Sequence, residues 1–291
     1  MQHDDSAKTV LVIGQGMLGL SWRPLLEMLE TKGVTHHCVD RMALDVTDEQ
    51  AVVETISDQI ELVVNTAAFT DVDRAEAEPE LAHLVNGTAV GYLARRCQDV
   101  GATLIHYSTD YVFNGRANQP YAVTAPHDPI NAYGRSKAAG ENALLSSGCN
   151  QLLIRTSWLY APWGKNFIRA ILAALHEKEV VPVVTDQRGR PTSAEFLVAA
   201  SWELYQRGAR GTFHVCDDGE CSWFEFAQEI AQISGAPGQV RASAAKDFPR
   251  PAPRPAYSVL DLSQTANWLG VLPRWQENVA KVVSDCIGEM A

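Results

Sequence analysis

The sequence predicts an α/β fold in which a doubly wound parallel sheet is joined to a smaller α/β lobe. Two observations lead to this prediction. Short apolar runs alternate with helical patterns through the first half of the 291-residue chain, and this alternation is typical of parallel βαβ units. The first run is followed by a glycine turn, Gly14-x-Gly16-x-x-Gly19, that opens a helix. A glycine turn in that place indicates a Rossmann-like, dinucleotide-binding sheet.

Up to about residue 157 the predicted elements follow a regular order. Strands are expected at 8–13, up to 40, 62–65, 102–107 and 152–155. Helices are expected from the glycine turn to about 32, from 47 to about 58, from 79 to about 100, and around Tyr133. Thr47 and Gln50 have the spacing of a capping box, and Pro79 suits the first turn of a helix.

Beyond about residue 157 this regular order loosens. Further helices are expected at 165–177, 193–206, 222–234 and 274–290, and Ser222 and Glu225 form a second capping-box pattern. The proline-rich segment 248–255 is interpreted as a stiff connecting loop in preference to a polyproline docking ligand. We therefore expect a dinucleotide-binding Rossmann domain over 1–157. Residues 158–291 are expected to form mainly a substrate-binding lobe, with some segments returning to the first domain.

Composition and charge exclude several classes of function. The net charge of −11 argues against a nucleic-acid-binding surface. No apolar run approaches the roughly 20 residues of a membrane span, and residues 1–6 are acidic where a signal peptide would be basic and then apolar. We expect no membrane attachment and a cytoplasmic location. The six cysteines form no CxxC pair and no zinc-like spacing with histidine, so neither a disulfide framework nor a metal site is predicted.

The glycine turn is the first candidate site. Gly14 permits the tight turn, Gly16 lets the backbone approach a pyrophosphate, and Gly19 lets helix and strand pack closely. The start of the helix supplies backbone N–H donors for phosphate groups. A turn with no ligand is the competing interpretation.

Residues after the second and third strands are candidates for the rest of a cofactor. Asp40 lies where an acid can accept hydrogen bonds from both ribose hydroxyls. The less favoured interpretation is a strand-end turn residue. Arg41 beside it could instead pair with a 2′-phosphate, so both NADH and NADPH stay open. Ala67 and Ala68 are small enough for a cofactor to pass over them.

Tyr133 and Lys137 stand four residues apart on one predicted helix, so they share a helical face. An ammonium near a phenol lowers the phenol pKa from about 10 towards neutral pH. Thr109, at the end of the fourth predicted strand, could hold an oxygen atom that is being protonated. Taken alone, the Tyr-x-x-x-Lys pair is also typical of an exposed helix.

Together these motifs resemble the extended short-chain dehydrogenases/reductases and, more narrowly, the family of dTDP-4-dehydrorhamnose reductases. The resemblance runs in the same order from residue 10 to about residue 275. The segments that carry it are 105–115 (IHYSTDYVFNG), 131–141 (NAYGRSKAAGE), 155–160 (RTSWLY), 186–192 (DQRGRPT) and 254–261 (RPAYSVLD).

The resemblance implies NADPH- or NADH-dependent reduction of the 4-keto group of a dTDP-4-keto-6-deoxyhexose. It implies that Thr109, Tyr133 and Lys137 are catalytic and that Tyr133 is the proton donor. Tyr111 and Trp158 would approach the sugar nucleotide. The residues implied to line the cofactor are Gly14, Gly16, Met17, Leu18, Gly19, Asp45, Val46, Ala67, Ala68 and Phe69, with Tyr133 and Lys137.

Arg254 is a candidate for the substrate diphosphate, because a guanidinium offers two parallel donors to phosphate oxygens. Some relatives are reported to use magnesium at a dimer interface, and Glu195 falls in the matching stretch. One carboxylate is too little for a magnesium site, so we predict no metal. A homodimer is compatible with the family, but the sequence leaves the oligomeric state open.

Three positions depart from the family pattern. One residue separates Gly14 from Gly16 where the family commonly has two, Phe69 replaces a more polar residue, and Tyr257 stands where the family usually has Asn. These departures leave open the preferred cofactor and the exact sugar.

Two other functions fit the same scaffold. The first is a nucleotide-sugar 4-ketoreductase of another kind, an epimerase or a dehydratase. Dehydratases place an acidic pair after the threonine, whereas here Tyr111 follows Asp110. The second is a non-catalytic regulatory subunit, against which the intact Thr109, Tyr133 and Lys137 set argues.

Overall fold

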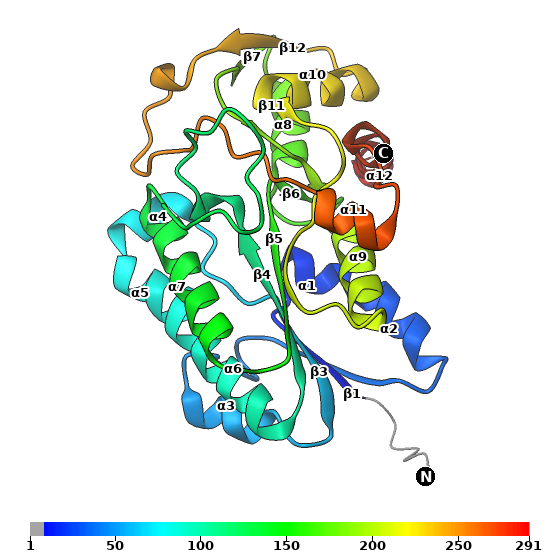
Figure 1. Ribbon diagram of the computed structural model, residues 1–291. Coiled ribbons are helices and arrows are strands. Elements are labelled where there is room, and N and C mark those ends of the chain that lie inside the picture. Colours follow the sequence, from blue (N-terminus) through cyan, green and yellow to red (C-terminus); the bar gives the residue numbers. More distant parts are fainter. Residues whose placement is uncertain (1–8, 291) are drawn as a thin grey trace.

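The computed structural model describes residues 9–290, so the acidic start of the chain lies outside the described residues. Its lower part is a six-stranded sheet flanked by helices on both faces, and a second lobe lies beyond one end of the strands (Figure 1). Within residues 9–290, none of the helices combines the length and the apolar character that crossing a bilayer requires.

The main sheet is parallel throughout and runs in the order β10-β5-β4-β3-β1-β2. β2 lies on one side of β1, and the chain then crosses to the other side of β1 to form β3. The crevice between β1 and β3 is therefore the switch point at which such sheets bind ligands. The strands are β1 (Thr9–Ile13), β2 (Thr35–Val39), β3 (Ile60–Asn65), β4 (Thr103–Thr109), β5 (Gln151–Thr156) and β10 (Gly211–His214). The predicted α/β, doubly wound parallel sheet is confirmed.

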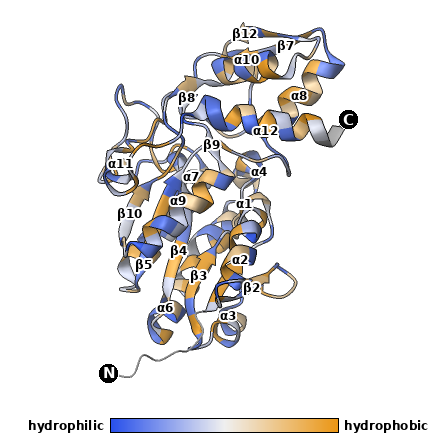
Figure 2. Cartoon of the chain, turned by 90° about the vertical axis from the view of Figure 1, so that its right-hand side faces the viewer, coloured by the Kyte–Doolittle hydropathy of each residue, from blue (hydrophilic) through white to orange (hydrophobic). Residues whose placement is uncertain are grey.

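Helices cover both faces of this sheet. They are α1 (Met17–Ser21), α2 (Arg23–Glu30), α3 (Glu49–Thr55), α4 (Val72–Ala77), α5 (Pro79–His83), α6 (Ala89–Val100), α7 (Ala132–Ser146) and α9 (Ala194–Gln206). In β1, Val10 and Val12 pack into the core beneath α1, α2 and α9, while Leu11 and Ile13 pack towards α3 and α6. Both faces of the central strands β1 and β3 are buried, so these two strands are mostly apolar, as Figure 2 shows for β3.

Two local predictions differ from the structure. The N-cap of α3 is Asp48, whose side chain accepts from the backbone N–H groups of Gln50 and Ala51. Thr47 is not available as a cap because its hydroxyl donates to Asp45 at 2.7 Å. The helix expected from Pro79 to about residue 100 begins as predicted but contains a π-helical turn, η1 (Leu84–Thr88), between α5 and α6.

The second lobe has its own apolar core, formed largely by α8 (Phe167–Glu177), α10 (Trp223–Ser234) and α12 (Trp275–Met290). A parallel pair, β7 (Val180–Val184) and β12 (Gln239–Ser243), packs against α10 and α8. The capping box of Ser222 and Glu225 is confirmed, since both reciprocal hydrogen bonds are present. The four helices predicted after residue 157 begin and end within two residues of their expected bounds.

The remaining elements that the structure describes are short. They are the pairs β6 (Leu159–Tyr160) with β9 (Thr192–Ser193) and β8 (Arg188–Gly189) with β11 (Cys221–Ser222), the 3-10 turns η2 (Asp110–Val112) and η3 (Ala245–Asp247), and α11 (Ser263–Leu269), which the sequence did not predict. The segments β10 and α9, from the second half of the chain, lie in and on the main sheet. The boundary between residues 157 and 158 stays a prediction.

Candidate active site

A cavity of about 900 Å³ opens at the carboxyl ends of β1, β3, β4 and β5. Residues predicted from the sequence make up much of its wall. They are Gly14, Gly16, Met17, Leu18, Asp40, Arg41, Asp45, Val46, Ala67, Ala68, Phe69, Thr109, Tyr111, Tyr133, Lys137 and Trp158. The predicted cofactor and catalytic residues are thus brought to one place, at the switch point of the sheet.

The glycine turn has little room for side chains on its protein side. Gly14 has a φ of +100°, and a Cβ there would lie 2.7 Å from Oγ1 of Thr66. A Cβ on Gly19 would lie 2.0 Å from the carbonyl oxygen of Gly14, so Gly19 serves close packing and does not itself line the cavity. Gly16 is the N-cap of α1 without a side-chain cap, and a Cβ there meets nothing within 4 Å. The turn therefore leaves open space and backbone donors facing the cavity, which fits a dinucleotide pyrophosphate.

The acidic residue after β2 closes a turn. Oδ1 of Asp40 accepts from the backbone N–H groups of Met42 and Ala43, at 2.9 and 3.0 Å. Arg41 is largely exposed and lies 3.5 Å from Asp45, nitrogen to oxygen. Hydrogen bonds from Thr47 lower the pKa of Asp45. Asp40 therefore acts as a turn residue here, and Arg41 presents an exposed guanidinium, paired with Asp45, at the same rim of the cavity.

The loop after β3 is held along the cavity by two asparagines. Oδ1 of Asn65 accepts from the N–H of Ala67 at 3.1 Å. Asn86, on the π-helical turn, accepts from the N–H of Phe69 at 2.8 Å and donates to its carbonyl oxygen at 2.9 Å. These bonds fix the backbone of 67–69, with its two small alanines, against the cavity wall.

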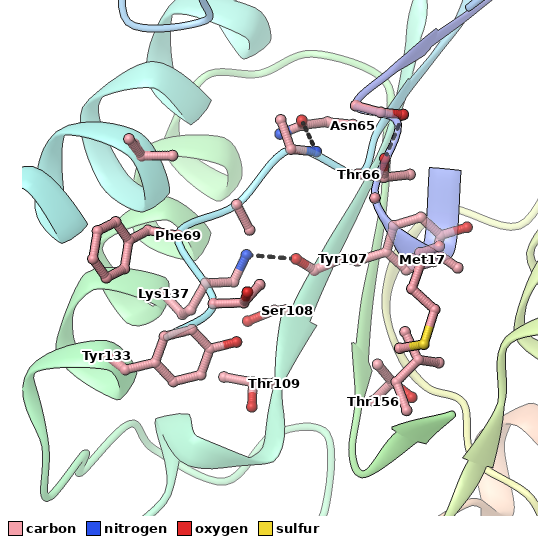
Figure 3. A pocket seen from close by; sticks show the side chains of 18 of the residues that line it. Met17, Asn65, Thr66, Phe69, Tyr107, Ser108, Thr109, Tyr133, Lys137 and Thr156 are labelled. Carbon is pink, nitrogen blue, oxygen red and sulfur yellow. Dashed lines mark hydrogen bonds between the residues drawn. The ribbon is translucent and has the colours of Figure 1, made fainter. Parts of the chain in front are cut away.

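The three predicted catalytic residues lie close together in the cavity wall, with the Tyr133 hydroxyl towards Thr109 and the Lys137 nitrogen towards the Tyr107 carbonyl (Figure 3). Tyr133 lies in the first turn of α7, whose N-cap Asn131 accepts from the N–H of Gly134 at 2.7 Å. Nζ of Lys137 donates to the carbonyl oxygen of Tyr107 at 2.7 Å. Thr109 ends β4, and its hydroxyl donates to Asp110 at 2.9 Å.

Burial dominates the electrostatics of these groups. Burial, and then the nearby Asp110 carboxylate, raise the pKa of Tyr133, against a hydrogen bond from Thr109 that lowers it. Burial lowers the pKa of Lys137 to about 8, against the attraction of Glu141. Burial also raises the pKa of Asp110 to about 6.

The sequence-based expectation that Lys137 lowers the Tyr133 pKa is not met in this structure. The shift has the opposite direction, because the phenol is buried and the Lys137 nitrogen points to the Tyr107 carbonyl. A raised pKa keeps the phenol protonated at neutral pH, which is the state that a proton donor needs.

A second cavity of about 610 Å³ adjoins the first, and Tyr111 and Trp223 line both. Trp158 stacks on Trp223 with ring centroids 3.6 Å apart and has a φ of +48°, which is unusual for a bulky side chain. Trp223 follows the N-cap Ser222 directly, but the sequence analysis did not select it because nothing in the local pattern pairs it with Trp158.

Arg254 lies in the wall of the second cavity. Its guanidinium forms a two-pronged ion pair with Asp73 of α4, at 2.7 and 3.0 Å, nitrogen to oxygen. Hydrogen bonds from Arg254 lower the pKa of Asp73. The sequence analysis missed Asp73, which lies 181 residues away from its partner.

Two residues singled out in the sequence lie elsewhere. The hydroxyl of Tyr257 donates to Glu220 at 3.3 Å, and Tyr257 lines neither cavity. The two carboxylate oxygens of Glu195 accept from Lys281 at 2.7 and 2.6 Å. Over residues 9–290, no cluster of three or more His, Cys, Asp or Glu side chains could hold a metal ion. All six cysteines are free thiols.

Comparison with known proteins agrees with this geometry. A family model described as the RmlD substrate binding domain matches residues 8–287. The chain is 36% identical to the spore coat polysaccharide biosynthesis protein SpsK of Bacillus subtilis, over 95% of this chain and 97% of that protein. It is 37% identical to a dTDP-4-dehydrorhamnose reductase of Mycolicibacterium smegmatis, over 98% of this chain and 88% of that protein.

Among solved structures, the dTDP-4-dehydrorhamnose reductase of Bacillus anthracis in complex with NADP has a TM-score of 0.90 and 32% identity. The match covers 96% of this chain and 99% of that chain. Sequence and fold therefore agree over nearly the full length of both proteins. The chain belongs to the RmlD substrate binding domain family, the family of the dTDP-4-dehydrorhamnose reductases.

Proposed function

We propose that this protein is an NAD(P)H-dependent oxidoreductase that converts dTDP-4-dehydrorhamnose to dTDP-L-rhamnose. The observation that carries the proposal is the junction of the two cavities. Tyr111 lines both, and its ring contacts that of Tyr133 edge to face with centroids 5.9 Å apart. A dinucleotide along the glycine turn and a sugar nucleotide in the second cavity would therefore meet beside the proposed proton donor.

Tyr133 donates the proton in this proposal. The bound nicotinamide would supply a hydride to the keto carbon. Tyr133 gives its phenolic proton to the keto oxygen, and burial keeps that proton in place until the substrate arrives. Help of this kind from a general acid is typically worth about 10²–10⁴ in rate.

Thr109 orients the substrate oxygen. Its hydroxyl now donates to Asp110, but a hydroxyl rotates freely and can turn its hydrogen to a carbonyl oxygen that enters the cavity. There it helps to stabilise the negative charge that develops on the oxygen. Lys137, on the same face of α7 as Tyr133, would hold the ribose of the nicotinamide.

The second cavity takes the sugar nucleotide. Trp158 lines the first cavity and would provide a flat wall at the sugar where the two cavities meet, because it stacks on Trp223, which lines both. Arg254 is placed to bind the diphosphate: Nη1 donates to Asp73 and to the carbonyl oxygen of Ala252, and the remaining donors, on Nε and Nη2, are proposed to bind phosphate oxygens. A binding site with aromatic walls and two arginines, Arg250 and Arg254, suits a flat base joined to two phosphates.

Both nicotinamide cofactors are proposed to bind. The turn uses only Oδ1 of Asp40, so Oδ2 can still accept a hydrogen bond from one ribose hydroxyl. The exposed Arg41 can pair with a 2′-phosphate. The relative from Bacillus anthracis was solved in complex with NADP. We therefore expect turnover with NADPH and with NADH.

The test is NADPH and NADH oxidation by the purified protein with dTDP-4-dehydrorhamnose and with UDP- and GDP-linked 4-keto hexoses. The dTDP sugar should be reduced fastest, and the product should be a 6-deoxyhexose with a new hydroxyl at C4. dTDP-glucose, which has no ketone, is the matched control without turnover. Cofactor binding without reduction of any sugar would instead favour the regulatory-subunit alternative.

We also propose that the protein is cytoplasmic and forms a homodimer, as expected from the sequence. A cytoplasmic enzyme would draw on the pool of nicotinamide dinucleotides there. Light scattering on the full-length protein decides between a monomer and a dimer, and addition of magnesium or a chelator shows whether a cation changes that state.

A further inference from the structure

A buried chain of polar side chains lies directly beneath Lys137, and the proposed mechanism does not use it. His106 on β4 is 1% exposed and is the register partner of Asn65 on β3. Nδ2 of Asn65 lies 3.1 Å from Nδ1 of His106. Nε2 of His106 lies 3.4 Å from Nζ of Lys137, whose other contact at hydrogen-bond distance is the Tyr107 carbonyl.

The orientation of the Asn65 amide is fixed by the backbone. Its Oδ1 accepts from the N–H of Ala67 at 3.1 Å (Figure 3). The NH₂ group must therefore be the part that faces Nδ1 of His106. An NH₂ group can only donate. Nδ1 of His106 is therefore an acceptor and carries no hydrogen.

A neutral imidazole with an unprotonated Nδ1 carries its hydrogen on Nε2. Burial and the Lys137 charge both disfavour the imidazolium form, and they lower the pKa of His106 well below its ordinary value. The N–H that results points at Nζ of Lys137. An N–H donor facing an ammonium is repulsive, whereas an N–H donor facing an uncharged amine forms a hydrogen bond.

We infer that Asn65 and His106 are positioning residues for Lys137: Asn65 locks the His106 proton on Nε2, and this N–H favours the uncharged amine of Lys137. The group that opposes them is Glu141, one turn further along α7, which attracts the ammonium but is already paired with Arg155. Tyr133 is neutral when protonated and adds no charge. Lys137 is thereby poised to exchange a proton near neutral pH.

The inference rests on the proposed catalytic role of Lys137, but it can be tested without substrate or cofactor. In protein labelled with ¹⁵N-histidine, the imidazole shifts report which nitrogen carries the proton, and the His106→Gln spectrum assigns the signals. His106 should remain neutral with its proton on Nε2 from pH 5 to pH 9, a range of about two units on either side of neutrality. A proton on Nδ1, or titration of His106 within this range, would overturn the inference.

Asn65→Asp keeps the shape of the side chain but should move the His106 proton from Nε2 to Nδ1. One carboxylate oxygen still accepts from Ala67, and the other now accepts from Nδ1–H, so Nε2 becomes an acceptor for the Lys137 ammonium. The titration of Lys137, followed by its ¹³Cε signal, should move up by about 1–3 units from its starting value near 8. An unchanged Lys137 titration would contradict the inference.

Asn86→Asp is the matched control. Asn86 is equally buried and also holds the cofactor loop, but its side chain contacts Phe69 and Ser136 and has no bond to His106. It should leave the His106 tautomer unchanged. If Asn65→Asp does not fold, the wild-type tautomer still decides the question, and a reductase assay that fails with a correct tautomer refutes the proposed function alone.

Discussion

At the scale of single residues, the proposed chemistry depends on one buried proton. Changing Tyr133→Phe removes the hydroxyl and keeps the ring packed against Tyr111. We expect turnover to fall by at least about 10²–10⁴, while the affinity for NADPH, measured by calorimetry, stays within about twofold of wild type because the ring remains in place.

Tyr121→Phe is the control for this prediction, because Tyr121 stacks on Phe113, bonds to Asn114 and lines neither cavity. The Tyr121→Phe enzyme should reduce the dTDP sugar at the wild-type rate. A Tyr133→Phe enzyme that reduces the dTDP sugar at a near-normal rate would show that another group supplies the proton.

Arg254 tests the substrate subsite at the same scale. Arg254→Lys keeps the positive charge but loses the two-pronged fork that bonds to Asp73 and is proposed to bind diphosphate. We expect dTDP to bind about tenfold or more weakly in calorimetry without cofactor, with NADPH affinity unchanged. Arg207 directly follows α9 and is paired with Glu203 at the surface, so Arg207→Lys should bind dTDP like wild type. Equal weakening in both variants would refute the assignment.

Single-residue predictions succeeded where a local motif exists. The residues of the glycine turn and of the Tyr-x-x-x-Lys pair all reach the first cavity except Gly19, which packs behind it. Asp73, His106 and Trp223 could not be predicted, because each acts through a partner that is distant in the chain: Arg254, Asn65 and Trp158 respectively. The direction in which the Tyr133 pKa shifts could not be predicted either, because it depends on burial of the phenol, which the Tyr-x-x-x-Lys pattern does not indicate.

At the scale of elements, α7 approaches its neighbours through glycines. A Cβ on Gly140 would lie 2.1 Å from the carbonyl oxygen of Asn86 in the π-helical turn. Gly140→Ala should therefore lower the free energy of unfolding by about 1–3 kcal/mol, since backbone must move to make room. It should also weaken cofactor binding, because Asn86 holds the loop at Phe69. Urea unfolding and NADPH calorimetry measure the two effects.

Gly91→Ala is the matched control in the neighbouring helix α6. A Cβ there meets its nearest atoms at 3.5 Å, which is ordinary contact. Alanine is the better helix former by roughly 0.5–1 kcal/mol, so this variant should be as stable as wild type or slightly more stable. Equal losses in both variants would mean that helix packing does not distinguish these glycines.

The sequence predicted most elements but not the break between α5 and α6. Apolar periodicity continues from Pro79 to about residue 100, and a π-helical turn leaves no clear mark on that pattern. Its position depends on the contacts of buried Asn86 with Phe69 and Ser136, which exist only after folding. The N-cap of α3 was misplaced by one residue because Thr47 and Asp48 are both good caps, and Asp45 engages the threonine.

At the scale of the whole molecule, one buried ion pair links the sheet to its covering layer. Arg155 on β5 bonds to Glu141 on α7 at 2.7 Å and to the carbonyl oxygen of Val123 at 2.9 Å. Burial alone would raise the pKa of Glu141, but hydrogen bonds from His127 and Arg155 outweigh it and lower the pKa to about 2. The pair therefore supports the fold fully above about pH 4.5, and this support is lost as the pH falls towards 2.

Glu141→Gln should cost about 3–5 kcal/mol at pH 7, because it leaves the Arg155 charge buried without a partner. The loss relative to wild type should shrink as the pH falls from 4.5 towards 2, where wild-type Glu141 also becomes neutral. Chemical unfolding at a series of pH values measures both. Glu49→Gln, which breaks an exposed pair with Arg95, is the control and should change little. A constant difference across the acid range would contradict this account.

The place of β10 in the main sheet has a consequence for the order in which the protein can be made. β10 pairs with β5, and α9 covers the face formed by α1 and α2, yet both elements follow residue 193. A nascent chain that has reached only residue 157 exposes an unpaired strand edge and one bare apolar face. The ribosome must deliver another 50 or so residues, to His214, before the sheet is complete. During that interval the unpaired edge of β5 and the uncovered apolar face are the parts of the chain most exposed to aggregation.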